Sequence, residues 1–152
     1  MFLHAGDTIS GQEGKATSVI DGLVQDMFYL KTVEAKFEKL KTEIKAIGKR
    51  GVQHKGNGWS GSGSMTFFYV TTIFRKMAFT YAKTGKDTYF NITVTNEDPT
   101  STIGKQTVVL YNCNIDNAIL AKLDSESDVL DEDIDFTFDD FDILDSFGNP
   151  VV

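Results

Sequence analysis

The chain has 152 residues, enough for one domain with a single hydrophobic core and too few for two. Its 41% hydrophobic and 24% charged residues exclude wholesale disorder and a collagen-like structure. Fifteen Lys and Arg against 22 Asp and Glu give a net charge of −7, which argues against a protein whose main activity is to hold nucleic acid phosphates. No membrane span or secretory signal is recognisable, so we expect synthesis in the cytoplasm.

The N-terminal region is rich in Gly, Ser and Thr, and residues 1–14 are predicted to form an arm without a core of its own. Lys15 to Ile20 predicts a short strand. The dipeptide Asp21-Gly22 follows it and favours the positive φ angles of a hairpin turn. We therefore expect one domain over residues 15–145, followed by a C-terminal tail over 146–152.

The next segment fits two kinds of secondary structure. Its large apolar residues are spaced by four, three, four and three, which is typical of an amphipathic helix. The first half also alternates as a strand would, with Ala35 and Phe37 on one face and Lys36 and Glu38 on the other. Periodicity favours the helix but leaves the strand open. The residues with helical spacing are Val33, Phe37, Leu40, Ile44 and Ile47.

Composition predicts a loop over residues 48–64, because this stretch contains six glycines. A strand signal follows at Ser64 to Tyr69. The clearest helix of the chain is then predicted over residues 71–84, with Thr71 as its cap and Gly85 as its left-handed end. Its apolar face consists of Val70, Ile73, Phe74, Met77, Ala78 and Tyr81.

The remaining chain is rich in β-branched and aromatic residues that alternate with polar ones. This pattern predicts strands at Tyr89 to Thr95, Gln106 to Ile115, Asn117 to Leu123 and Asp133 to Phe138. The predicted fold class is therefore mainly β, a β-sandwich or partly open barrel with one flanking α-helix.

Motifs for cofactors and metals match only in part. Gly56 to Gly61 has the letters of a dinucleotide-binding loop, but a strand follows it where a helix N-terminus is needed. The aspartates from Asp131 to Asp135 mimic the first ligands of an EF-hand, but Phe136 stands where a glycine is required. We expect no cofactor and no bound metal.

Candidate catalytic side chains are isolated from one another. His4 and His54 are the only histidines, and neither has a second ligand at metal-binding spacing. Cys113 has no histidine at a recognisable spacing, so we interpret it as a buried small residue rather than a nucleophile. The sequence thus predicts no catalytic residues. Trp59 either folds back on the core or anchors a partner, and the sequence favours neither.

Charge is unevenly distributed along the chain. Lys and Arg concentrate between Lys31 and Arg50, whereas Asp124 to Asp145 is acidic and contains no Lys or Arg. Two solvated faces would explain this pattern. The alternative is that the two stretches meet, within a subunit or between subunits. On that hypothesis we expect reversal of Lys39, Lys41 and Lys45 to Glu to block assembly while leaving the monomer folded.

Four segments in this order closely resemble the tail tube proteins of contractile phages and of PBSX-type phage-like particles. No single one is diagnostic, but together they run from about Thr8 to Asp142 in the order of that family. The segments are Thr8-Ile9-Ser10-Gly11-Gln12-Glu13-Gly14, Gly61-Ser62-Gly63-Ser64-Met65-Thr66-Phe67, Leu110-Tyr111-Asn112 and Asp135-Phe136-Thr137-Phe138-Asp139-Asp140-Phe141-Asp142.

The resemblance implies a structural subunit rather than an enzyme. Six subunits would close a ring with a continuous inner β-barrel, and the rings would stack into a tube in the virion tail. It also implies that Leu30 to Lys45 is a long bent strand or hairpin arm. Expected partners are other copies of the chain, the tail sheath, tape measure, baseplate and tail terminator proteins, and DNA only in transit, with no membrane.

Contacts between subunits are expected at eight positions, and residues 1–14 and 48–64 are expected to be mobile in the monomer and ordered in the tube. The alternatives are a DNA-free tube of a contractile bacteriocin or secretion-like particle, or a monomeric β-sandwich module that binds a peptide or glycan through Trp59. The contact positions are Ile9, Lys39, Lys41, Lys45, His54, Trp59, Asp139 and Asp142.

Overall fold

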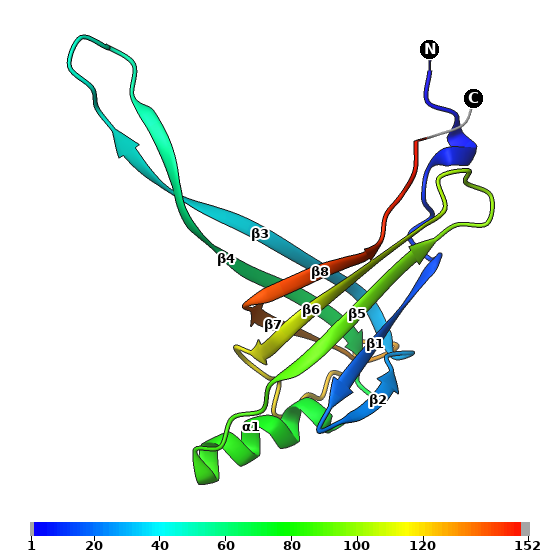
Figure 1. Cartoon of the computed structure of the whole chain (residues 1–152). Coiled ribbons are helices and arrows are strands. Elements are labelled where there is room, and N and C mark those ends of the chain that lie inside the picture. Colours follow the sequence, from blue (N-terminus) through cyan, green and yellow to red (C-terminus); the bar gives the residue numbers. More distant parts are fainter. Residues whose placement is uncertain (1, 150–152) are drawn as a thin grey trace.

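The computed structural model describes residues 2–149 as an open, mainly antiparallel β structure with one α-helix at its base (Figure 1). The strands follow the order β2-β1-β5-β6-β7-β4-β3, and β8 pairs with β6 outside that path. The elements are η1 (Ala5–Asp7), β1 (Gly14–Ile20), β2 (Leu23–Asp26), β3 (Leu30–Ile44), β4 (Gln53–Phe68), α1 (Ile73–Thr84), β5 (Phe90–Glu97), β6 (Lys105–Ile115), β7 (Asp131–Phe138) and β8 (Asp140–Asp145).

The strands form two layers that share β6. One layer contains β2, β1, β5, β6 and β8, and the other contains β3, β4 and β7, which reaches only the last two residues of β6. The sheet does not close, because β3 and β2 lie at its two ends. This arrangement confirms the predicted mainly β fold with one flanking helix.

Asn112 marks the point where β6 passes from one layer to the other. Its φ of 54° is left-handed, a conformation that Asn tolerates better than most residues. Its side-chain amide donates to both carboxylate oxygens of Asp139, at 3.0 and 3.1 Å. The neighbouring Tyr111 hydroxyl donates to Asp142 at 2.9 Å. Two segments that carry the family resemblance, residues 110–112 and 135–142, are therefore joined by hydrogen bonds at the corner between β7 and β8.

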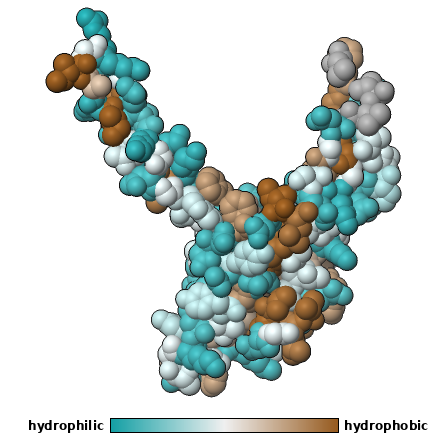
Figure 2. All heavy atoms as spheres, in the orientation of Figure 1, coloured by the Kyte–Doolittle hydropathy of each residue, from teal (hydrophilic) through white to brown (hydrophobic). Residues whose placement is uncertain are grey.

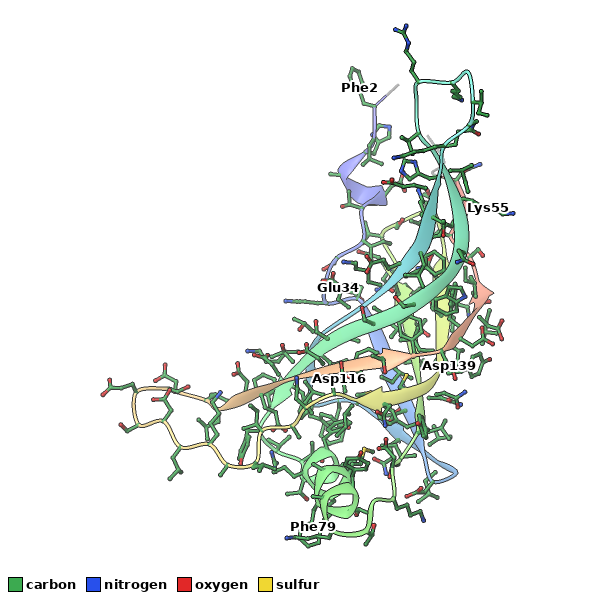
Figure 3. All side chains as sticks on the ribbon, turned by 90° about the vertical axis from the view of Figure 1, so that its left-hand side faces the viewer. Phe2, Glu34, Lys55, Phe79, Asp116 and Asp139 are labelled. Carbon is green, nitrogen blue, oxygen red and sulfur yellow. The ribbon has the colours of Figure 1, made fainter. Side chains whose placement is uncertain are left out.

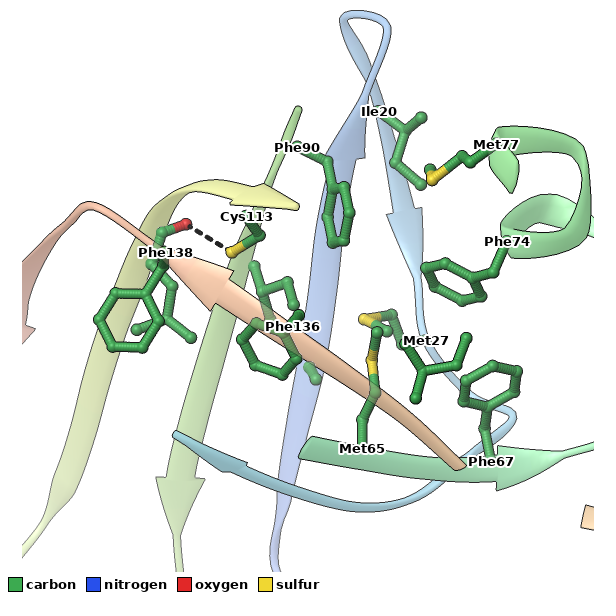
Figure 4. Packing of buried hydrophobic residues seen from close by; sticks show 14 of the residues in the cluster. Ile20, Met27, Met65, Phe67, Phe74, Met77, Phe90, Cys113, Phe136 and Phe138 are labelled. Atoms are coloured by element: carbon green, nitrogen blue, oxygen red, sulfur yellow. Dashed lines mark hydrogen bonds between the residues drawn. The ribbon is translucent and has the colours of Figure 1, made fainter. Parts of the chain in front are cut away.

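The hydrophobic core lies between the two layers and is closed at the base by α1 (Figure 4). Phe67 and Phe136 are fully buried, and Phe74 of the helix packs against Phe67 with ring centroids 5.0 Å apart. Burial of such side chains stabilises the fold by about 1.5–3 kcal/mol each. Cys113 is also buried, as predicted, and burial raises the pKa of its thiol to about 12.

Two glycines of β4 make room for aromatic rings of β7. Gly61 lies opposite Phe138 and Gly63 lies opposite Phe136 in the antiparallel register. A Cβ atom on either glycine would come within 2.5 Å of the facing ring. The two rings thus cover the backbone of glycines that have no side chain of their own, a known way of stabilising glycines in sheets. This pairing explains why glycines occur within the strand.

The structure corrects the helix and the loop predicted between residues 30 and 64. Residues 30–44 are the long strand β3, as the family resemblance implies, and most of the glycine-rich stretch is its partner β4. The helical spacing misleads because residues 38–47 are all exposed, so the position of an apolar residue in this stretch is not set by a core. The β3–β4 register also shifts between Lys39 and Lys41, which leaves Leu40 without a partner and interrupts the alternation of the strand. Glycine content misleads here because Gly61 and Gly63 serve packing rather than a turn.

One further strand prediction is wrong, and one strand was missed. Asn117 to Leu123 alternates but lies outside the sheet, in the connection between β6 and β7, where no neighbouring strand offers a ladder of hydrogen bonds. Strand β8 was not predicted, because its aspartates resemble a solvated acidic tail. The β1–β2 hairpin, with Asp21 and Gly22 at positive φ, confirms the predicted turn.

The N-terminal segment contacts its own subunit. The Asp7 carboxylate accepts hydrogen bonds from the backbone and hydroxyl of Thr102, and Asp98 accepts one from the Ser10 amide at 2.9 Å. These bonds hold the pKa of both aspartates below the ordinary value of 3.8. Helix α1 confirms the predicted helix and ends at Gly85 in the left-handed region, with Phe74 and Met77 buried. Val70 precedes the helix and Tyr81 is exposed, so these two residues of the predicted apolar face do not contribute to the core. Among the described residues, no helix is long and apolar enough to cross a membrane.

Candidate assembly surface

The most unusual feature of the molecule is the hairpin of β3 and β4, which projects far from the body (Figure 1). Strand β4 pairs with β7 only from Gly61 to Phe68, so residues 38–60 have no sheet neighbour except each other. We call residues 38–60 the hairpin arm. All its residues except Trp59 are exposed. A two-stranded ribbon without a third strand or a covering helix is marginally stable in water.

The hairpin arm ends in a tight turn. The Lys49 amide donates to the Ala46 carbonyl at 3.3 Å, and Gly48 has a φ of 85° at the third position of the turn. A type II turn requires such a positive φ, which explains the glycine. Ile47 occupies the second position and is fully exposed. The hairpin arm therefore presents an uncovered apolar side chain at its apex.

An aromatic cluster fixes the root of the hairpin arm to the body. The Trp59 ring stacks on Phe37 at 5.1 Å and meets the edge of Phe141 at 5.5 Å between centroids. Phe138 lies 6.1 Å from the same indole ring. Trp59 therefore folds back on its own subunit, one of the two alternatives that the sequence left open. About half of Phe37 remains exposed beside it, at 47%.

Basic side chains dominate the hairpin arm. It carries six Lys and Arg residues against two glutamates. In the described part of the chain, no carboxylate lies within ion-pairing distance of Lys39, Lys41 or Lys45. Figure 2 shows a largely hydrophilic arm with hydrophobic side chains gathered near its tip. The exposed lysines are available for a partner of opposite charge.

Among residues 2–149, the basic and acidic stretches meet in one ion pair, which lies at the base of β3. Lys31 donates to Asp131 at 2.9 Å, which lowers the pKa of that carboxyl group. Asp139 and Asp142 are instead bound to Asn112 and Tyr111.

The predicted contact positions fall into three places. Lys39 lies opposite Trp59 in the register, and Trp59 contacts Phe141, so these positions gather with Asp139 and Asp142 at the root of the hairpin arm. Farther out on the hairpin arm lie Lys41, Lys45 and His54. Ile9 is half-buried in the N-terminal segment, apart from the others.

The outward face of β3, β4 and β7 in the body is polar apart from Phe68 at the end of β4, and this face was not recognised in the sequence. The residues between the core-facing positions are hydroxyl-bearing or charged, with three acids and one lysine. Thr66 donates to Asp133 at 2.6 Å across this face. The alternation of Gly-Ser-Gly-Ser in β4 is the signal that could have identified it. Its members are Thr32, Glu34, Lys36, Ser62, Ser64, Thr66, Asp133, Asp135 and Thr137.

The acidic positions that resembled an EF-hand each have a protein partner. Asp131 binds Lys31, Asp133 accepts from Thr66, and Asp135 accepts from the Asn117 amide at 3.1 Å. Residues 2–149 contain no group of three His, Cys, Asp or Glu side chains placed to hold a metal ion.

An open sandwich with free strand edges and a projecting arm is typical of a subunit that assembles with copies of itself. A family model described as "Phage tail tube protein" matches residues 1–145 of the chain. The chain therefore belongs to the phage tail tube protein family, whose members are structural components of phage tails.

Individual relatives agree with this family. The chain is 41% identical to the phage-like element PBSX protein XkdM of Bacillus subtilis (strain 168) over 143 residues, 94% of this chain and 95% of the relative. A solved structure from Bacillus subtilis is 39% identical, with a TM-score of 0.53 over 93% of this chain and 99% of that one.

Contractile particles contain proteins of the same fold. A chain in the tube-terminating cap of the anti-feeding prophage has a TM-score of 0.70 at 9% identity, covering 94% of this chain and 93% of that one. A chain in the sheath-tube complex of an extracellular contractile injection system (PVC) has a TM-score of 0.66 at 12% identity, covering 90% of both chains.

Proposed function

We propose that this chain is the structural subunit of the inner tube of a contractile phage tail or tail-like particle. Six copies close a ring, and the rings stack into the tube. The observation that carries this proposal is the hairpin arm, which is exposed everywhere except at Trp59 and which, beyond that residue, no other element among the described residues covers. The chain belongs to the tail tube protein family, and in our proposal the hairpin arm makes the contacts with neighbouring subunits.

Ring closure removes the free edge of β3. That strand is 15 residues long and, within the described part of the chain, pairs only with β4, so its other side leaves backbone donors and acceptors for a neighbour. Charged side chains along β3 are typical of an edge protected against unspecific pairing. A neighbouring subunit that adds its own strands beside β3 continues the sheet, and six such junctions produce one barrel without edges.

The polar outward face of β3, β4 and β7 becomes the inner wall of that barrel in our proposal. It is composed of hydroxyl and charged groups with an excess of acids, as described above. A negative wall repels phosphates, so DNA or a tape measure protein could pass without adhering. The chain would thus be a conduit for DNA and not a protein that binds it.

The remaining partners follow from the position of such a tube. We propose contacts with tail sheath, tape measure, baseplate and tail terminator proteins, in a virion tail whose subunits are made in the host cytoplasm. Structures of similar fold come from a baseplate, a tube-terminating cap and a sheath-tube complex, which supports this environment. The subunit would work as a structural element without catalysis.

Electron microscopy of the purified protein tests this function. Size-exclusion chromatography over rising concentration should show a monomer that converts to large assemblies, and micrographs should show hollow tubes of constant width with six-fold symmetry. A monomer at every concentration, or rings of another symmetry, would contradict the proposal.

A charge-reversal variant tests the role of the hairpin arm in the same assay. Reversal of Lys39, Lys41 and Lys45 to Glu should abolish or slow tube growth while the monomer stays folded, because all three are exposed and unpaired within the described subunit. The control reverses Lys76, Lys83 and Lys86, which are also exposed and lie in or after α1. Equal loss of tubes in both variants would contradict a specific role of the arm.

A further inference from the structure

A second projection lies in the connection between β6 and β7. Residues 116–130 leave the body and return to it without joining the sheet, and we call them the acidic loop. Its root is fastened, because Arg75 donates to the Ile119 carbonyl at 3.4 Å and Lys122 donates to the Asp131 carbonyl at 2.7 Å. Its apex, residues 123–129, is exposed at every position.

The apex of the acidic loop combines negative charge with uncovered apolar side chains. It carries three acids and no Lys or Arg. Leu123 is almost fully exposed at 99%, and Val129 is 61% exposed. The Asp124 carboxylate accepts a hydrogen bond from the Glu126 amide at 3.0 Å, which shapes the turn. Glu126 and Asp128 have no ion pair within the described subunit.

The tip of the hairpin arm has the complementary composition. Residues 45–52 carry three Lys and Arg residues and no acid, and their apolar side chains Ile47 and Val52 are exposed. Both surfaces therefore consist of two exposed apolar side chains among three charges, with opposite signs. Such a pair attracts over a distance and can then bury its apolar groups in contact.

The two surfaces lie at opposite ends of the subunit. Figure 3 shows the hairpin arm extending upward beyond Lys55, while the acidic loop leaves the body beyond Asp116, near the level of α1. Within one subunit the tip cannot reach the loop. A head-to-tail contact between different surfaces of successive copies continues without limit, which is the requirement for a stack of rings.

We propose that the tip of the hairpin arm in one ring docks on the acidic loop of a subunit in the next ring. This inference rests on the proposed function and specifies the contact by which rings stack. Ile47 packs against Leu123 and Val129, while Lys49 and Arg50 face Glu126 and Asp128. The acidic loop is thus an inter-ring receptor, a role distinct from that of the β3 edge, which closes the ring.

Two charge reversals and their mixture test the contact. The tip variant carries Lys49→Glu and Arg50→Glu, and the loop variant carries Glu126→Lys and Asp128→Lys. All four side chains are exposed, so circular dichroism and the melting temperature of each monomer should match those of the unaltered chain. Each variant alone should form single rings and lose tubes, because like charges then meet at every ring junction.

The mixture of the two variants is the decisive sample. Tips of the tip variant then meet loops of the loop variant with opposite charge, and the reverse junction pairs the two unaltered surfaces. Tubes should therefore return in an equimolar mixture, and also in a chain that carries all four substitutions. Negative-stain electron microscopy counts rings and tubes in every sample.

Three results would overturn the contact. Tube growth of either single variant at the unaltered rate would show that the two surfaces do not meet, and failure of the mixture to restore tubes would show that they meet other partners. Loss of rings as well as tubes would place the contact within a ring. If the unaltered chain forms neither rings nor tubes, the proposed function fails instead, and the two failures are thereby distinguished.

Discussion

Strands β3 and β4 run from the body of the subunit into the hairpin arm, and the two parts of this hairpin differ in their packing. In the body, β4 alternates between core-facing residues such as Phe67 and polar residues such as Thr66. Beyond Gly61, the same strand continues for eight residues with only β3 beside it and no core to cover. The part in the body buries its apolar side chains within the subunit, whereas the hairpin arm leaves its apolar side chains exposed to neighbouring subunits.

This difference indicates which interactions stabilise each region. Burial stabilises the body, at about 25 cal/mol per Å² of apolar surface. The hairpin arm gains less from burial in the monomer, because all its residues except Trp59 are exposed and Ile47 at its tip is fully exposed. Substitutions in the body should therefore change the stability of the monomer, and substitutions in the arm should change assembly.

The sharpest version of this comparison uses two apolar residues of the same hairpin. Phe67→Ala should lower the free energy of unfolding by about 3–5 kcal/mol, because it leaves a cavity among fully buried rings. Ile47→Ala, at the fully exposed tip, should change it by less than about 0.5 kcal/mol. Urea denaturation of both monomers measures the values. Similar losses in the two variants would show that the arm is part of the cooperative core.

The ion pair beneath the helix makes a prediction that depends on pH. Arg75 contacts Glu132 at 2.6 Å, and the Glu132 side chain is only 2% exposed. Burial raises the pKa of Glu132, while Arg75 opposes that rise. Arg75→Met should cost about 3–5 kcal/mol at neutral pH, because it leaves a buried carboxylate without its partner.

The cost of Arg75→Met should shrink as the pH falls. Without Arg75 the pKa of Glu132 rises further above its ordinary value of 4.5, so the folded variant binds a proton that the unfolded chain does not yet bind. Uptake of that proton neutralises the buried group, and the deficit declines as the pH approaches 4.5. Thermal melts of both proteins across this range measure the difference, and a deficit independent of pH would contradict the assignment.

A pair of glycines provides a smaller contrast between body and arm. Gly63→Ala places a methyl group 2.5 Å from the Phe136 ring and 2.6 Å from the Glu34 carbonyl, which should cost about 1–3 kcal/mol. Gly51→Ala is the matched control in the hairpin arm, where the nearest atom is 3.9 Å away. Chemical denaturation should separate the two, and an unaffected Gly63→Ala would disprove the tight packing of β7 on β4.

The smallest effect concerns the attachment of the N-terminal segment. The lowered pKa values of Asp7 and Asp98 mean that these carboxylates stabilise the attachment fully above their ordinary value of 3.8. That contribution should be lost as the pH falls below 3.8, so amides near Ser10 should exchange faster in acid while the core stays protected. Exchange that does not depend on acid would contradict the role of the carboxylates.

The sequence predicts the body better than the arm, and the reason is physical. Helix α1 and strands β1, β5 and β7 bury one face each, so their periodicity reports their structure. In the hairpin arm no face is buried, so the spacing of Leu40, Ile44 and Ile47 does not indicate which secondary structure they adopt. The acidic β8 was missed because its hydrogen bonds to β6 depend on a distant strand.

Part of the assembly surface could be recognised and part could not. The lysines between residues 39 and 45 could be recognised from the charge distribution alone, since they are concentrated in a short stretch of sequence. Trp59 was ambiguous because Phe138 and Phe141, which it contacts, lie about eighty positions farther along the chain. The polar face and the acidic loop required the register and the topology, which place β7 next to β4.

Hydrogen exchange in monomer and tube tests most directly whether the hairpin arm is completed by neighbouring subunits. We predict that amides of residues 38–60 exchange rapidly in the monomer and become protected in the tube. Amides of β5 and β7 should be protected equally in both states, because their core lies within one subunit. A hairpin arm as protected as β5 in the monomer, or one that remains unprotected in the tube, would contradict the account.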